Sequence, residues 1–409
     1  MRKTLLFVTF SVLLTPLVYS QSSVSDFLLT AFEDVSLNQY NSQLNYINRT
    51  NTRLPIIDEV EVRMSNDQRT YEDARYQLRL RPANPWKVRR NNALFNARRE
   101  EISAEKKLEY KDNLFGRYQL VLEYFEQQEL AKLFRNRLTL LDKKTTLFLE
   151  NSSSDIFDAR DFVDSKIEQV EILEQLTTIE GKRNNTRLEI LAWMEQTDFD
   201  WDTFEIIEPE AIDSIAALIS SRNLSSLEIQ YLTKRFETAR QETRVERADF
   251  DLGYIQTEYA PFIDADEKNL GFSLGFTIPI FQKNKPQIAE RMLDQLRREN
   301  ILSAETKIDS INKTLEYGFL LTLTKQHFQL QSDIKNLNLG LLLINLAQSE
   351  NYDPIAVIKL EEADLLLQEM IIKSKFSVLE QYLDFLYTYD AITETPQINY
   401  LAKELSPLE

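Results

Sequence analysis

Residues 269–281 read NLGFSLGFTIPIF, and this stretch decides the fold. Its large apolar residues alternate with small or polar ones: Phe272, Leu274, Phe276 and Ile278 against Gly271, Ser273, Gly275 and Thr277. Strict alternation with a period of two is typical of a β-strand whose faces differ. A strand that is bulky and apolar on one face and small and polar on the other suits a barrel wall between lipid and water. Pro279 then leads into a long polar helical stretch.

The composition of the chain excludes several classes of protein. It has 409 residues, 7 glycines, no cysteine and a net charge of −17. Without cysteine there is no disulfide framework, no cysteine metal site and no lipid-modified cysteine. Scarce glycine indicates long, uninterrupted helices. The acidic balance argues against nucleic acid as a partner.

Residues 1–20 have the features of a secretory signal peptide. Arg2 and Lys3 precede an apolar run over residues 5–18, and residues 18–20 (VYS) offer a cleavage site. The alternative is an uncleaved anchor, but the run is short for a membrane span. No later stretch approaches ~18 unbroken apolar residues, so we expect no transmembrane helix in the mature chain.

The same order of strand hairpin and long helices recurs in the two halves of the sequence, which predicts an internal duplication. One strand hairpin is expected at about 57–82, where Val60, Val62, Met64, Leu78 and Leu80 form the apolar alternation, and a second at about 250–281. Pro82 and Pro279 are 197 positions apart, and Asp155 and Asp353 are 198 apart. These matching offsets indicate a domain-sized repeat. The strands of the first hairpin look short, at roughly six to nine residues, where a membrane strand needs ~9–11.

The pattern of apolar residues predicts four long helices and two repeats. We expect a first repeat at 21–222, with helices 86–150 and 155–194 and a side region at 197–222 that contains a short helix near 209–220. The second repeat, 223–409, has helices 287–348 and 353–388 and a C-terminal tail. A helix of about 60 residues is roughly 90 Å long, so such helices must pack along their sides as in coiled coils.

Several stretches resemble the TolC-like outer-membrane efflux protein family. They are Leu54-Pro55, residues 155–160 (DIFDAR), residues 217–224 (ALISSRNL) and residues 274–281 (LGFTIPIF). The resemblance covers nearly the whole mature chain. It implies a mainly α fold with a small β-barrel portion, in which duplicated long helical hairpins form a periplasmic tunnel. It also implies a homotrimer in which each protomer gives four strands to one shared twelve-stranded barrel.

The resemblance also implies a function and a location. Members of the family are passive channels in the outer membrane of Gram-negative bacteria, with a large periplasmic portion. They work with a periplasmic adaptor protein and an inner-membrane pump in tripartite efflux or type I secretion. This is the leading hypothesis. A periplasmic coiled-coil scaffold with a reduced barrel is the alternative, and a periplasmic adaptor ranks last because this chain has two helical hairpins and few glycines.

Two groups of residues are candidate functional sites. The periplasmic tip, which would form the aperture and contact the adaptor, comprises Asn151, Ser152, Ser153, Ser154, Asp155, Asp158, Glu350, Asn351, Tyr352 and Asp353. The acids there can simply cap helices, but capping does not exclude a second role, and we expect them to narrow the aperture and bind cations. The pore lining of the barrel comprises Arg79, Arg81, Ser273 and Thr277. Its arginines either pair with acids such as Glu61 across the hairpin or form a cationic ring.

The sequence offers no constellation for catalysis. It has a single histidine, His327, within a helical stretch and without cysteine partners, so we expect a structural role for it. Phosphate-binding glycine loops, nucleophile elbows and zinc-protease motifs are absent from the sequence. We therefore expect no enzymatic activity, no cofactor and no metal site.

Overall fold

The computed structural model describes residues 23–49, 56–66, 74–153, 158–194, 201, 204–222, 226–250, 252–259, 270–277, 284–348 and 353–408. The expected signal peptide, residues 1–20, lies outside them. Within this part of the chain, no helix has the length and apolar character needed to cross a membrane.

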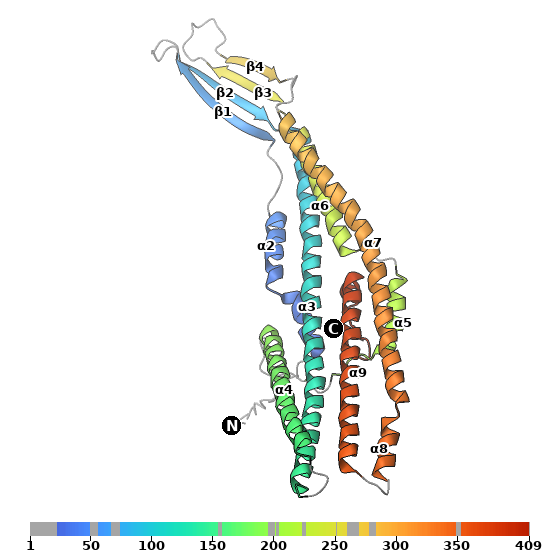
Figure 1. The fold of residues 1–409 in the computed structure, drawn as a ribbon. Helices are drawn as coiled ribbons and strands as arrows, with labels where there is room; N and C mark the ends of the chain where they lie inside the picture. The colour runs from blue at the N-terminus through green and yellow to red at the C-terminus, as the bar shows by residue number, and fades with distance from the viewer. Residues whose placement is uncertain are drawn as a thin grey trace, which may run out of the picture.

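Long helices lie side by side and carry a small sheet at one end (Figure 1). The helices of the first half are α1 (Val24–Leu29), α2 (Ser36–Arg49), α3 (Pro85–Glu150) and α4 (Ala159–Met194), with the short η1 (Thr30–Glu33). The later ones are α5 (Pro209–Ser220), α6 (Leu227–Arg247), α7 (Lys285–Asn336), α8 (Leu339–Ala347), α9 (Pro354–Thr388) and η3 (Ala391–Thr393). The predicted fold class, long helical hairpins with four strands, is confirmed for the protomer.

The ends of the long helices follow local capping chemistry. The Asn84 side chain accepts hydrogen bonds from the backbone N–H groups of Trp86 and Lys87, and Pro85 occupies the first helical position of α3. Asp353 caps α9 in the same way by accepting from Ile355 N at 2.9 Å. The described part of α4 begins at Ala159 with Asp158 as its cap, whereas the second helix was expected to start at 155. Asp155 lies outside the described residues.

The single helix expected over 287–348 is two helices. α7 ends at Asn336 and α8 begins at Leu339, with Asn338 between them at φ 50°. This left-handed conformation is one that asparagine tolerates better than most residues. The Asn338 side chain donates a hydrogen bond to the carbonyl of Asn336 at 3.1 Å, which satisfies one of the groups freed by the break.

The four long strands form one antiparallel sheet in sequence order. They are β1 (Ile57–Asn66), β2 (Ala74–Pro82), β3 (Gly253–Tyr259) and β4 (Leu270–Phe276). The expectation of a short first hairpin was wrong, since its strands have 10 and 9 residues. Backbone pairing continues through polar residues, as in Ser65 opposite Arg75, where apolar alternation gives no signal.

A buried core at the middle of the helical body includes the last residues of the described chain. Phe27 of α1, Tyr118 of α3, Tyr382 and Phe385 of α9, and Leu401 are all fully buried. The segment before α5 pairs with this C-terminal tail, because Ile207 N donates to Leu401 O at 2.8 Å and Lys403 N donates to Glu205 O at 2.9 Å. The short strands β5 (Ile398–Asn399) and β6 (Ser406–Pro407) pair within the tail. The division into two repeats stays a prediction.

A close contact between β3 and β4 explains one glycine. Gly275 is paired with Tyr254, and a Cβ at position 275 would lie only 2.5 Å from the Tyr254 ring. The guanidinium of Arg79 lies 4.3 Å from the centre of the same ring. The ring is therefore held between a cation and a bare stretch of backbone, an arrangement that only glycine permits.

We expect Gly275→Ala to lower the free energy of unfolding by about 1–3 kcal/mol, because the Tyr254 ring must leave its place. Gly271→Ala is the matched control on the same strand, where an added Cβ would lie 3.6 Å from Glu258 Cβ, an ordinary contact. The measurement is the midpoint of heat-induced unfolding of the purified variants. Equal midpoints for the two variants would contradict this account of the strand pair.

Candidate functional site

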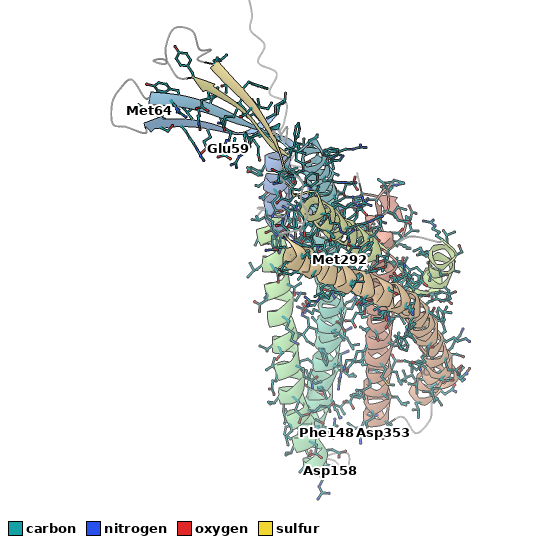
Figure 2. The ribbon with its side chains drawn as sticks, turned by 90° about the horizontal axis from the view of Figure 1, so that it is seen from above. Glu59, Met64, Phe148, Asp158, Met292 and Asp353 are labelled. Carbon is teal, nitrogen blue, oxygen red and sulfur yellow. The ribbon has the colours of Figure 1, made fainter. Side chains whose placement is uncertain are left out.

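One face of the sheet is apolar and open to its surroundings. The cross-strand register places its residues in rows: Val60, Leu80, Ile255 and Leu274; Val62, Leu78, Thr257 and Phe272; Met64, Tyr76, Tyr259 and Leu270. Val62 is 73% exposed, Phe272 65% and Phe276 82%. Figure 2 shows Glu59 at the helical end of the sheet and Met64 at the far end, well away from the helices. If it were exposed to water, such a continuous apolar face would either bind a partner or promote aggregation.

The opposite face of the sheet is polar. Glu61, Arg79, Gln256 and Ser273 form one of its rows. Arg79 Nε donates to Gln256 Oε1 at 3.0 Å, and its Nη1 lies 3.5 Å from Glu61. Arg81 Nη1 lies 2.8 Å from Glu59. The arginines thus pair with carboxylates across the first hairpin, which favours the charge-pair interpretation over an uncompensated cationic ring.

The two remaining pore-lining candidates are placed differently along β4. Ser273 is exposed on the polar face, opposite Gln256. Thr277 follows the last strand residue, and its N–H donates to Leu252 O at 3.4 Å. Sequence reasoning missed Glu59, Tyr254 and Gln256 as partners of the arginines. The alternation in β1 and β3 would have placed them on that face, but only the register identifies the pairs.

The far edge of the apolar face carries a pair of tyrosines. Tyr76 and Tyr259 are Cα partners on β2 and β3, and they are 42% and 48% exposed. Aromatic residues with a polar tip are enriched at membrane–water interfaces. Tyr76 extends the apolar surface of the first hairpin and joins it to the second hairpin.

The tip candidates lie at the end of the helical body opposite the sheet. In the first tip, the Asn151 amide donates to Leu147 O at 2.8 Å, and Ser152 N donates to Leu149 O at 3.3 Å. Ser153 belongs to the same turn, whereas Ser154 and Asp155 lie outside the described residues. The turn therefore closes α3 with its own polar groups.

The two tips lie at the same end of the molecule. Figure 2 shows Asp158 and Asp353 at this end. Each caps a helix: Asp158 accepts from Arg160 N at 2.8 Å, and Asp353 caps α9. Glu350, Asn351 and Tyr352 lie outside the described residues.

Two ion pairs link the helical hairpins close to the tips. Lys359 of α9 lies 3.3 Å from Asp161 of α4, and Lys144 of α3 lies 2.8 Å from Glu362 of α9. The first pair is exposed and the second is largely shielded from solvent. Neither was anticipated from sequence, because the pairs join residues about 200 positions apart. Any separation of the two hairpins at this end has to break them.

His327 is enclosed between helices. It is 1% exposed, its Nδ1 lies 3.1 Å from Ser374 Oγ, and its Nε2 lies 2.9 Å from the Gln331 amide nitrogen. Burial lowers the pKa of this imidazole below its ordinary value, which favours the neutral form. Both ring nitrogens lie within hydrogen-bonding distance of neighbouring side chains, which fits a structural role. Among the described residues, no group of three His, Cys, Asp or Glu side chains is arranged to hold a metal ion.

No family model and no curated protein matches the chain in sequence. Its structure, however, is similar to several solved membrane proteins. A membrane protein from Pseudomonas aeruginosa is 12% identical with a TM-score of 0.67, and the match covers 90% of each chain.

Two further structures extend this likeness. The open state of the Neisseria gonorrhoeae MtrE outer membrane channel is 11% identical with a TM-score of 0.64, covering 90% of this chain and 88% of that one. The Vibrio cholerae outer membrane protein VceC is 12% identical with a TM-score of 0.63, covering 93% and 97%. At identities this low, the structural similarity supports the fold alone, and the matches cover nearly the whole of each chain. The chain therefore has the fold of these outer-membrane channels, the TolC-like fold.

Proposed function

We propose that this protein is a TolC-like outer-membrane channel, a passive conduit for export across the periplasm and the outer membrane. The observation that carries the proposal is the sheet, which has one exposed apolar face and one polar face across all four strands. A barrel wall between lipid and water needs this division. The strands of the first hairpin, with 10 and 9 residues, reach the ~9–11 residues that a tilted membrane strand needs.

A homotrimer is supported by two unpartnered edges of the protomer. α4 exposes Val163, Ile167 and Val170 at helical spacing, and α7 exposes Ile308 and Ile311. In Figure 1 these helices flank the body on opposite sides. Different apolar patches on opposite edges suit a head-to-tail ring. β1 and β4 are the free edges of the sheet, and pairing them between neighbours would close a barrel without an exposed edge.

We propose a working cycle that uses this arrangement. The channel has no energy source of its own, so a periplasmic adaptor and an inner-membrane pump supply it. The adaptor engages the tips and separates the helical hairpins, which breaks the Lys359–Asp161 and Lys144–Glu362 pairs. The alternative, a periplasmic scaffold with a reduced barrel, leaves the apolar face of the sheet in water and is therefore disfavoured.

The polar face predicts how the pore selects ions. In Arg79→Ser/Arg81→Ser, Glu59 loses its partner and Glu61 keeps only Arg63, so the pore should become more selective for cations. In Glu59→Gln/Glu61→Gln, the freed arginines should shift selectivity toward anions. The measurement is the reversal potential of single channels under a salt gradient. If both double variants keep the wild-type reversal potential, the polar face does not line the pore and the proposal fails.

The tips predict a response to divalent cations. We expect these cations to lower the conductance, and to do so less in Asp158→Asn/Asp353→Asn, because a shared aperture gathers the carboxylates of several protomers. Asparagine keeps the capping oxygen of each helix, so the variant removes charge and preserves structure. The measurement is single-channel conductance with and without added divalent cation.

The matched control for the tips removes the same charge higher on the helices. Asp142→Asn/Asp364→Asn affects carboxylates that accept hydrogen bonds from Gln169 and Gln368, bonds that asparagine can keep. This control should retain the wild-type response to divalent cations. A tip variant that is blocked as strongly as the control would show that Asp158 and Asp353 only cap their helices.

A further inference from the structure

A concentration of positive charge lies at the junction of the helices with the sheet. Residues 86–99, the start of α3, contain five cations and no acid, although the chain carries a net charge of −17. α6 ends at this junction with Arg244 and Arg247, and α7 begins there with Lys285. We call Arg89, Arg90, Arg244, Arg247 and Lys285 the basic collar. Each lies within about 9 Å, measured along its helix, of the end that leads to the sheet.

The helices that carry the collar are fastened together, so its charges share one scaffold. Lys87 of α3 lies 2.7 Å from Asp249, just after α6. Glu242 of α6 binds both Arg98 of α3 at 2.9 Å and Arg291 of α7 at 3.2 Å. Glu242 and Asp249 are thus engaged with cations outside the collar.

Among the described residues, the five collar residues have no acidic partner. In the part of the chain that the structure describes, none of the five forms an ion pair, and Arg247 donates only to the sulfur of Met292 at 3.3 Å. Arg244 and Arg247 suit the C-terminal end of α6, where the helix dipole favours cations. Lys285 lies in the first turn of α7, where the dipole disfavours a cation, so helix electrostatics does not explain the group.

An exposed tryptophan accompanies the charges. Trp86 is 59% exposed, with its ring 6.0 Å from that of Phe250. Arg89 and Arg90 follow it by three and four positions and therefore share its side of α3. Tryptophan favours the membrane–water interface, and long basic side chains extend toward lipid phosphates there. Directly beyond this junction begins the apolar face of the sheet, at Val60, Leu80, Ile255 and Leu274.

We propose that the basic collar binds the phosphate groups of anionic lipids at the membrane surface that faces the periplasm. This inference rests on the proposed barrel, which sets the apolar band of the sheet in the bilayer and leaves the collar at the level of the headgroups. The attraction holds the channel at a fixed height, because shifting it either way moves the cations off the plane of phosphates.

Lipid preference at Trp86 tests the collar. The full-length channel is reconstituted into bilayers, and its tryptophan fluorescence is quenched by brominated phosphatidylglycerol or brominated phosphatidylcholine. We expect the wild type to prefer phosphatidylglycerol, and Arg89→Ser/Arg90→Ser to weaken this preference by up to about fivefold per residue. High salt should reduce it as well, whereas inorganic phosphate added at constant ionic strength should not, since a single small anion does not replace a charged surface.

The control is Lys182→Ser/Arg187→Ser on α4, which removes two exposed cations far from the sheet. It should keep the wild-type preference. The collar proposal is overturned if Arg89→Ser/Arg90→Ser matches the wild type, if both double variants lose the preference equally, or if inorganic phosphate abolishes it. If no brominated lipid quenches Trp86, measured against Trp86→Phe, the barrel proposal fails first, so the two failures are distinguishable.

Discussion

The pairing of β2 with β3 joins the two halves of the sheet, and the separation of its faces depends on that register. A slip by one residue would turn every side chain of one hairpin to the other face. Asn84, at the helical end of the sheet, helps to fix this register. Its amide nitrogen donates to the carbonyls of Ala248 and Phe250 at 2.8 and 2.9 Å, and its side-chain oxygen caps α3. One buried side chain thus holds the chain leaving β2 against the chain entering β3.

At the middle of the helical body, two buried ion pairs connect α3 to the segment after η1 and to the segment after α9. Arg117 of α3 lies 2.7 Å from Asp34, and Lys111 lies 2.7 Å from Asp390. Burial raises the pKa of Asp34, but hydrogen bonds from Ser36 and Arg117 outweigh it, so its pKa is lowered and it stays charged. Removing one partner of such a pair commonly costs about 3–5 kcal/mol. These pairs specify how the terminal segments dock on α3.

Much of this architecture could be predicted from sequence because its signals are local. Alternation placed Phe272 and Leu274 on one face, and Asp353 with Pro354 marked the start of α9. The break at Asn338 was missed because Leu337 and Leu339 continue the apolar helical pattern, although Asn338 and Gly340 are weak helix formers. The length of β1 was underestimated because ladder hydrogen bonds need no apolar side chain. The Arg79 contacts depend on register, and the link between Lys359 and Asp161 depends on packing, so neither has a local signature.

In the proposed channel, β4 is part of a barrel wall with lipid on one side and water on the other. The chain contains no cysteine, so single cysteines can be introduced without background. Ser273→Cys and Leu274→Cys are neighbours on opposite faces of this strand. In intact outer membranes, we predict that a charged, water-soluble maleimide labels position 273 and spares position 274, while a lipid-soluble maleimide labels position 274. Equal labelling of both positions by the charged reagent would contradict the account.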